Sequence, residues 1–421
     1  MRTCVIIGFN ILILDKLFGK GRKMSFNEKM YGLGSKRSII REIFEYSKKR
    51  AAEIGADKVF DFSLGNPSVP APTEVKEAIE ELIATESSVS LHGYTSAQGD
   101  AEVRGAIADS ISRRFSVDMS GDLVYMTCGA AASLSICLRA LVEGEGEECI
   151  VFAPFFTEYR VFAENAGAKL VISEPDGETL MPDIADFESR ITEKTKAVIL
   201  NSPNNPSGVV YTEEIIKRIC AVLEKKSLEY KKPIYLIADE PYRELVYSGV
   251  SVPYLMNYYK NTLVCYSYSK SLSLPGERIG YIAVCPYMEE AREVYLAICG
   301  AGRSLGYVCA PSLFQKVIKK CIDAKVNVDA YRENRDILYD NLTAYGYKCV
   351  KPEGAFYLFV KAPGWDSYAF YEKAKAHEIL VVPCEDFGVS GYVRIAYCTE
   401  KSRVVNALPA FRALAEEYKS L

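Results

Sequence analysis

The 421-residue chain has few of the residues and patterns that mark several large classes of protein. It contains two histidines, His92 and His377, which lie far apart in the sequence. A histidine-based metal site is therefore not expected, and we predict no bound metal. The 51 basic side chains are balanced by 55 acidic ones, for a net charge of −4. This balance gives no electrostatic footprint for nucleic acid or for an anionic membrane surface.

Long apolar runs are also lacking. The apolar stretch at residues 4–14 is too short to span a bilayer, and no small-residue cleavage site follows it,. We expect residues 1–23 to be a mis-annotated or disordered extension that precedes a true start at Met24. The thirteen cysteines form no C-x-x-C pair. In a long chain without secretory context they indicate reduced thiols, and we expect a cytoplasmic protein with no membrane partner.

Short apolar runs alternate with amphipathic segments through the middle of the chain. Such units predict a largely parallel sheet covered by helices on both faces, which is an α/β fold. The expected strands of this region are residues 123–126, 149–152, 169–172, 197–200, 234–238 and 262–265. Helices are expected over residues 35–55, from Thr73, near Asp100, and over residues 129–141, 158–166 and 212–229,.

The chain beyond Pro311 has a different pattern. A long helical region to about Tyr345 is followed by mixed strands and helices, which indicates an α+β arrangement,. The later elements expected are strands at 356–360, near Ile379 and near Val393, and a closing helix from Lys401. At this length we predict two domains. They are a large domain over residues 72–310 and a smaller one formed by residues 24–71 and 311–421.

The residues around Lys270 are the first that indicate a chemical function. An apolar run leads into Ser267, Ser269 and Lys270, and Arg278 follows eight positions after the lysine. Hydroxyls and a guanidinium can hold a phosphate dianion. A lysine beside a bound phosphate cofactor is the usual arrangement for a Schiff base with pyridoxal phosphate. Taken alone, the stretch is equally compatible with a solvated loop.

Further polar or small residues follow other predicted strands, where ligands bind in open α/β sheets. Gly129-Ala130-Ala131 opens a helix whose free N–H groups would favour a phosphate, although a simple strand-to-helix turn explains it equally well,. Asn205 lies in a rigid Asn- and Pro-rich turn. Asp239 ends a buried strand, where a carboxylate is costly unless it has a partner,. A pyridinium nitrogen would be a suitable one.

Together these motifs resemble the class I/II aminotransferases, the pyridoxal-phosphate enzymes of fold type I that include aspartate aminotransferase. The match covers residues 30–415 in the family's order. The segments that carry it are Gly65-Asn66-Pro67, Tyr94, Gly99, Arg104, Gly129-Ala130-Ala131, Pro154-Phe155-Phe156, Asn204-Asn205-Pro206-Ser207-Gly208, Asp239-Glu240-Pro241-Tyr242, Ser267-Tyr268-Ser269-Lys270, Arg278 and Val393-Arg394-Ile395. The resemblance implies a large domain with a mostly parallel sheet and a smaller α+β domain.

The resemblance also implies roles around the cofactor ring. Lys270 would form the Schiff base and shuttle the proton of the substrate Cα. Asp239 would keep the ring nitrogen protonated. Asn205 and Tyr242 would donate hydrogen bonds to the phenolic oxygen of the ring. Phe156 would stack on the ring face, although a core role for this phenylalanine remains open.

Other implied roles concern the phosphate, the substrate and a second subunit. The residues implied to hold the phosphate are Gly129, Ala130, Ala131, Ser267, Ser269 and Arg278. Arg394 would grip the substrate α-carboxylate, with Gly65 and Asn205 beside it. Tyr94 would reach the phosphate of a neighbouring subunit, which implies a homodimer with shared sites. Simple packing of Tyr94 is the alternative.

The expected activity is transfer of an amino group from an L-amino acid to a 2-oxo acid such as 2-oxoglutarate, in a ping-pong cycle. Aspartate is the first guess for the donor, on family frequency alone. A dicarboxylate donor needs a second cation, for which Lys36, Arg37 and Arg41 are candidates. A C–S β-lyase of the same fold is the main alternative. A pyridoxal-phosphate-binding regulatory protein is less favoured, because no DNA-binding domain precedes the match.

Overall fold

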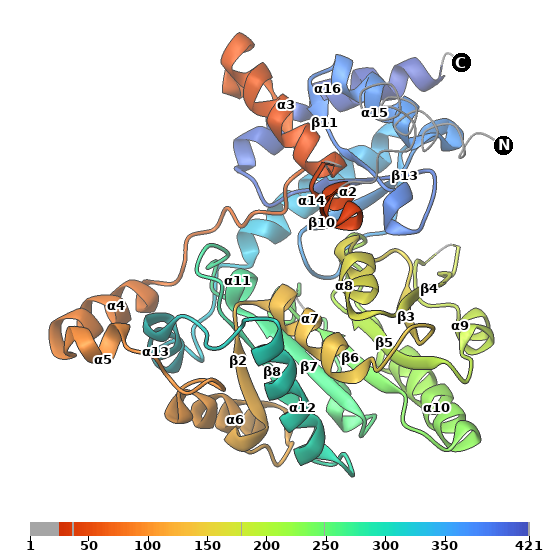
Figure 1. Ribbon diagram of the computed structural model, residues 1–421. Helices are drawn as coiled ribbons and strands as arrows, with labels where there is room; N and C mark the ends of the chain where they lie inside the picture. Colours follow the sequence, from red (N-terminus) through yellow and green to blue (C-terminus); the bar gives the residue numbers. More distant parts are fainter. Residues whose placement is uncertain (1–24, 36–37, 178, 248, 420–421) are drawn as a thin grey trace.

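The computed structural model describes residues 25–35, 38–177, 179–247 and 249–419 (Figure 1). The predictions for residues 1–23, and the candidate cations Lys36 and Arg37, lie outside the described residues. Within those ranges, no helix is both long and apolar enough to cross a membrane.

A seven-stranded sheet forms the centre of the larger part of the molecule. Its strand order is β2-β8-β7-β6-β5-β3-β4, and every strand except β8 runs in the same direction. The strands are β2 (Val124–Thr127), β3 (Glu148–Phe152), β4 (Lys169–Ser173), β5 (Thr195–Asn201), β6 (Tyr235–Asp239), β7 (Thr262–Ser267) and β8 (Gly280–Val284). The predicted α/β class with a mostly parallel sheet is confirmed.

Helices cover both faces of this sheet, which is why its strands are apolar on both sides. Along β7, Cys265 lies in the core shared with one helical layer and Val264 in the core shared with the other. The first layer is α7 (Ala130–Leu141), α8 (Glu158–Ala166) and α12 (Ala291–Ser304). The second core includes α6 (Ala101–Phe115), α9 (Ile184–Arg190), α10 (Glu213–Tyr230) and α13 (Ser312–Lys320), with α4 (Thr73–Thr85) and α5 (Ser88–His92) beside α13.

The smaller part of the molecule joins segments from both ends of the described chain, as the red and blue elements of Figure 1 show. A four-stranded antiparallel sheet has the order β12-β13-β10-β9, and a short parallel pair joins β1 to β11. These strands are β1 (Phe60–Asp61), β9 (Lys348–Cys349), β10 (Tyr357–Lys361), β11 (Ile379–Leu380), β12 (Val382–Pro383) and β13 (Tyr392–Ala396). The accompanying helices are α2 (Glu28–Ser35), α3 (Ile39–Ile54), α14 (Asp329–Tyr345), α15 (Ser367–Ala376) and α16 (Lys401–Lys419). The domain boundaries near residues 72 and 310 stay a prediction.

Two local predictions need correction. The helical region expected up to Tyr345 is two helices, α13 and α14, because the segment between them contains Val326, Asn327 and Val328, which favour other conformations,. Asn327 instead accepts a hydrogen bond from the backbone of the next helix, at 3.1 Å. The helix expected from residue 35 begins at Ile39, because the Ser38 hydroxyl caps it,. Strand β8 and helix α12 were not predicted.

Candidate active site

The strand register brings the predicted site residues together at the edge of the large sheet where its parallel strands have their carboxyl ends. Asn201, the last residue of β5, lies opposite Asp239, the last residue of β6. Ser267 ends β7 opposite Gly280, and Thr127 of β2 lies opposite Gly280 from the other side. Because these parallel strands end together, their terminal side chains face a common space.

A cavity of about 380 Å³ opens at this edge. Twelve of the fourteen predicted site residues line it: Gly65, Ala130, Ala131, Phe156, Asn205, Asp239, Tyr242, Ser267, Ser269, Lys270, Arg278 and Arg394. Gly129 is the N-cap residue of α7, next to Ala130 of the cavity wall. Tyr94 is not on the wall, and its side chain is 96% exposed in the loop after α5.

Lys270 is held in a short helix, α11 (Tyr268–Ser271), at the end of β7. The Ser267 hydroxyl caps this helix by accepting a hydrogen bond from the backbone of Ser269, at 3.2 Å. The Lys270 Nζ donates to the carbonyl oxygen of Gly65 at 2.8 Å. Burial lowers the pKa of Lys270 to about 8, and the nearby cations Arg278 and Arg394 act in the same direction,.

Asp239 is a buried carboxylate with one satisfied oxygen. Its Oδ2 accepts a hydrogen bond of 2.5 Å from the Tyr159 hydroxyl, and its backbone oxygen accepts one of 2.9 Å from the Asn201 amide. Its Oδ1 has no hydrogen-bond partner among the described residues. Burial raises the pKa of Asp239 to about 7; the Tyr159 hydrogen bond opposes this, and the Glu240 charge adds to it. An open, buried carboxylate oxygen is a site for a cationic N–H donor.

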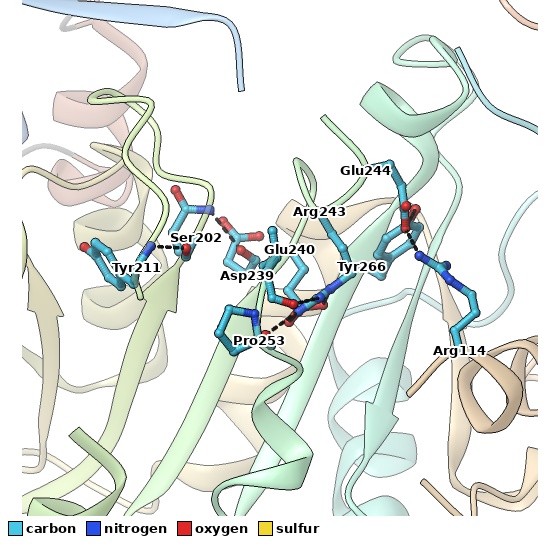
Figure 2. Close-up of polar contacts among 11 residues, drawn as sticks. Arg114, Ser202, Tyr211, Asp239, Glu240, Arg243, Glu244, Pro253 and Tyr266 are labelled. Carbon is cyan, nitrogen blue, oxygen red and sulfur yellow. Dashed lines mark hydrogen bonds and ion pairs between the residues drawn. The ribbon is translucent and has the colours of Figure 1, made fainter. Parts of the chain in front are cut away.

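The next residue, Glu240, belongs to a separate hydrogen-bond network with Arg243 (Figure 2). Arg243 donates to both of its carboxylate oxygens at 2.5 Å. The same guanidinium donates to the carbonyl oxygens of Val252 and Pro253, each at 3.0 Å. Both charged groups are therefore neutralised and hydrogen-bonded, although they are buried.

Arg394 enters the cavity from β13 of the smaller sheet. It is 2% exposed. Its guanidinium donates to the carbonyl oxygen of Ser63 at 2.6 Å and to the side-chain oxygen of Asn205 at 3.2 Å. Its Nε has no partner within the part of the chain that the structure describes. The guanidinium lies 4.7 Å from the ring centre of Tyr357. A buried cation with a free N–H is suited to an anionic ligand.

Small residues and hydroxyls meet Arg278 at the opposite end of the cavity. The hydroxyl oxygens of Ser267 and Ser269 lie 2.7 Å apart. A Cβ added at Gly129, which has a φ of 86°, would lie 2.9 Å from a guanidinium nitrogen of Arg278. At Gly280 an added Cβ would lie 2.3 Å from the Tyr266 carbonyl oxygen. The two glycines therefore allow Arg278, the start of α7 and the two serines to approach closely.

Three residues of the site were not predicted from the sequence. Tyr159 supports Asp239 from α8, and the Asn201 amide supports the same strand end. Tyr357 of β10 lines the cavity, and its hydroxyl lies 2.9 Å from that of Tyr242. With 29 tyrosines in the chain, neither tyrosine could be singled out from the sequence. Of the three, Asn201 was the easiest to identify from the sequence, because it follows a predicted strand.

The second cation expected for a dicarboxylate is not supplied by Arg41. This residue is exposed on α3 and is not among the residues that line the cavity. The described cations of the cavity wall are Lys270, Arg278 and Arg394. The same described ranges contain no group of three His, Cys, Asp or Glu side chains that could hold a metal ion.

Comparisons with known proteins agree with this geometry. Residues 57–411 match the family model described as aminotransferase class I and II. An aspartate aminotransferase of Thermotoga maritima is 31% identical over 86% of this chain and 93% of its own length. An aspartate/prephenate aminotransferase of Thermus thermophilus is 29% identical over 82% of this chain and 88% of its own length.

Solved structures are similar over nearly the whole chain. The crystal structure of an amino transferase from Eubacterium rectale has a TM-score of 0.93 and 56% identity, and the match covers 94% of this chain and 100% of that one. The Thermus thermophilus aspartate aminotransferase with maleate has a TM-score of 0.81 and 25% identity, with 93% and 100% covered. The chain therefore belongs to the aminotransferase class I and II family, whose members are transferases that use pyridoxal phosphate.

Proposed function

We propose that this aminotransferase moves the amino group of an L-amino acid to a 2-oxo acid such as 2-oxoglutarate, in a ping-pong cycle with Lys270 as its central residue. Aspartate is the first candidate donor. The names of the Thermotoga and Thermus relatives support this choice, as does the Thermus structure with maleate, a dicarboxylate. The observation that carries the proposal is the unpaired oxygen of Asp239, a residue that lines the same cavity as Lys270 and Arg394.

The residues of the cavity fit pyridoxal phosphate. Its ring nitrogen needs an anionic partner, and the Oδ1 of Asp239 is buried and without one in the described chain. Its phosphate needs several donors, which Arg278, Ser267, Ser269 and the first N–H groups of α7 would provide,. When bound, pyridoxal phosphate supplies a ring that accepts the electrons released at the substrate Cα.

Asp239 would hold the proton on the ring nitrogen. The carboxylate must stay ionised for this task, although burial disfavours its charged form,. Tyr159 stabilises the charged form by donating a hydrogen bond to Oδ2. Asn201 keeps the end of β6 in place by donating to the backbone oxygen of Asp239. These contacts leave Oδ1 without a partner among the described residues.

Lys270 would attach the cofactor through Nζ and would move the proton of the substrate Cα. Its pKa of about 8 means that the amine can lose and regain a proton near neutral pH,. As a free amine, Nζ donates a hydrogen bond to the Gly65 carbonyl at the cavity wall. The hydroxyl of Tyr242 and the amide of Asn205 would hold the phenolic oxygen of the ring, and Phe156 would cover its face.

Arg394 would bind the substrate α-carboxylate, with Gly65 beside it. Ser63 and Asn205 fix two of its nitrogens and leave Nε unpaired in the described structure. The guanidinium is therefore oriented before a substrate arrives, which reduces the cost of ordering it. Burial strengthens the attraction between the two charges.

We also propose a homodimer in which Tyr94 reaches the cavity of the second subunit. Tyr94 is 96% exposed, and Val89 of α5 and Ile83 of α4 are 83% and 62% exposed. Helices α4 and α5 contact each other, and an exposed apolar patch favours burial against a partner,. Measurement of the molar mass in solution, with a Tyr94→Ala variant assayed for cofactor affinity, tests this arrangement.

The direct test of the reaction is a half-reaction on the purified protein loaded with pyridoxal phosphate. Single amino acids are added without any oxo acid, and the absorbance of the cofactor and the oxo-acid product are followed. We expect stoichiometric formation of oxo acid from the correct donor, with aspartate tested first, and none with Lys270→Ala. Continuous release of pyruvate from cysteine or cystathionine would instead establish a C–S β-lyase.

A further inference from the structure

Tyr242 and Tyr357 form a hydroxyl pair that joins the two parts of the molecule inside the cavity. Tyr242 lies in the turn after β6 of the large sheet, and Tyr357 begins β10 of the smaller sheet. Their hydroxyl oxygens are 2.9 Å apart. Their side chains are buried, and both line the cavity. The Tyr357 hydroxyl is closely packed, because a Cβ added at Gly65 would lie 2.1 Å from its oxygen.

A count of protons shows what this pair can offer to a ligand. Each hydroxyl has one proton to donate. Neither hydroxyl has another hydrogen-bond partner in the described residues, so the bond between them uses one proton and leaves the other free. If an acceptor in the cavity takes the proton of Tyr242, the bond of the pair must run from Tyr357 to Tyr242. The Tyr357 hydroxyl then orients the Tyr242 hydroxyl.

We propose that Tyr357 is a positioning residue that donates to the Tyr242 hydroxyl and so directs the Tyr242 proton to the phenolic oxygen of the cofactor. The inference rests on the proposed function, because it needs Tyr242 to face the cofactor. Donation from Tyr357 makes Tyr242 a stronger donor, since linked hydrogen bonds polarise one another. The orientation of the Tyr242 hydroxyl then also depends on how β10 packs against the large sheet.

The charged and titratable groups around the pair come from several elements. Asp239 acts on Tyr242 from β6, Arg394 acts on both tyrosines from β13, and Cys398 acts on Tyr357 from the segment after β13. Lys270 of α11 lies on the same cavity wall. Tyr357→Phe leaves all four groups in place and removes a single oxygen atom.

A second tyrosine pair provides a matched control. The hydroxyls of Tyr247 and Tyr397 also lie 2.9 Å apart and are also buried. They too join the segment after β6 to the smaller sheet. Tyr247 donates in addition to the carbonyl oxygen of Ala355 at 2.6 Å, and neither tyrosine lines the cavity. Tyr397→Phe therefore removes an equivalent buried hydroxyl from outside the site.

The experiment compares Tyr357→Phe with Tyr397→Phe, both loaded with pyridoxal phosphate and without substrate. The pH titration of the cofactor absorbance, the dissociation constant for pyridoxal phosphate and the unfolding midpoint are measured. We expect Tyr357→Phe to make proton release from the bound cofactor about five- to tenfold less favourable. The affinity of the protein for pyridoxal phosphate should fall by the same factor, which is the effect of one hydrogen bond. Tyr397→Phe should leave both cofactor measurements within about twofold of the wild-type values. It should lower the unfolding midpoint as much as Tyr357→Phe does, or more.

The double variant Tyr242→Phe/Tyr357→Phe tests the direction of the bond. If Tyr357 acts through Tyr242, the double variant has the cofactor properties of Tyr242→Phe alone. Additive effects of the two substitutions would overturn the inference, and so would a Tyr357→Phe titration that matches Tyr397→Phe. A wild-type protein that forms no cofactor absorbance band would overturn the proposed function and this inference with it.

Discussion

Two neighbouring carboxylates at the end of β6 differ in their hydrogen bonding. Asp239 and Glu240 are 5% and 3% exposed. Both oxygens of Glu240 are bonded to Arg243, whereas the Oδ1 of Asp239 has no hydrogen-bond partner in the described chain. Buried polar groups in proteins are normally satisfied, and we propose that this unpaired oxygen of a residue on the cavity wall binds a ligand,. Glu240 is held in an ion pair with Arg243, whereas we propose that Asp239 takes part in the reaction.

The environment of Arg243 explains why Glu240 can stay buried. The guanidinium lies 5.1 Å from the ring centres of both Phe115 and Tyr254. Two backbone carbonyls complete its hydrogen bonds. A buried ion pair is tolerated when its geometry and remaining hydrogen bonds are complete. Asp239 has no such cation in the chain that the structure describes, and we propose that the cofactor provides it.

Loss of the Asp239 charge should have the largest effect on activity. We expect Asp239→Asn to lower kcat/KM by roughly a thousandfold or more, equivalent to about 4 kcal/mol of transition-state stabilisation. The free energy of unfolding of the cofactor-free protein should not fall, because Asn can still accept the Tyr159 hydrogen bond. Retention of activity within tenfold of wild type would contradict the assigned role.

Removal of the Arg243 charge should show the opposite pattern. Arg243→Met leaves Glu240 buried and unpaired, and we expect the free energy of unfolding in urea to fall by about 3–5 kcal/mol. The double variant Glu240→Gln/Arg243→Met removes both charges and should recover a large part of this loss. If the double variant is no more stable than the single one, the ion pair is not what holds this region together.

The pH dependence of stability sharpens the comparison. The pKa of Asp239 is raised to about 7 in the folded protein, above a value near 3.9 in the unfolded chain. Its stabilising contribution is therefore full below about pH 4 and is lost as the pH rises through about 7. Relative to Asp239→Asn, the cofactor-free wild type should lose about 2 kcal/mol of unfolding free energy between pH 5 and 7. A flat difference would show that Asp239 is already paired.

Tyr159→Phe should have the smallest effect. It removes the hydrogen bond to Asp239 Oδ2, which favours the ionised carboxylate. We expect the affinity for pyridoxal phosphate to fall about fivefold, the effect of roughly 1 kcal/mol, and more steeply below pH 7. Tyr211→Phe serves as the control, because this buried tyrosine lies near Tyr159, whereas the hydrogen bond to Asp239 comes from Tyr159. Equal losses in both variants would indicate a packing effect only.

Much of the candidate site could be predicted because its residues follow local signals. Ser267, Ser269, Lys270 and Arg278 lie within one strand-to-turn segment, and Asp239 ends a continuous apolar run. Sequence patterns of this kind report where a strand or helix ends, and ligands bind at strand ends in this class of sheet. The family resemblance could then be stated residue by residue.

The sequence by itself determined the class of fold, the order of most strands and helices, and the family, because periodicity, caps and strand-end motifs are local properties. It did not show that β8 runs antiparallel, or that Tyr159 contacts Asp239 and Tyr357 contacts Tyr242. Those facts depend on contacts between residues far apart in the chain, such as Tyr159 with Asp239, 80 positions apart, and Tyr242 with Tyr357, 115 positions apart. Only the tertiary structure decides such pairings, because strand register and helix packing select the few side chains that meet among many of the same type.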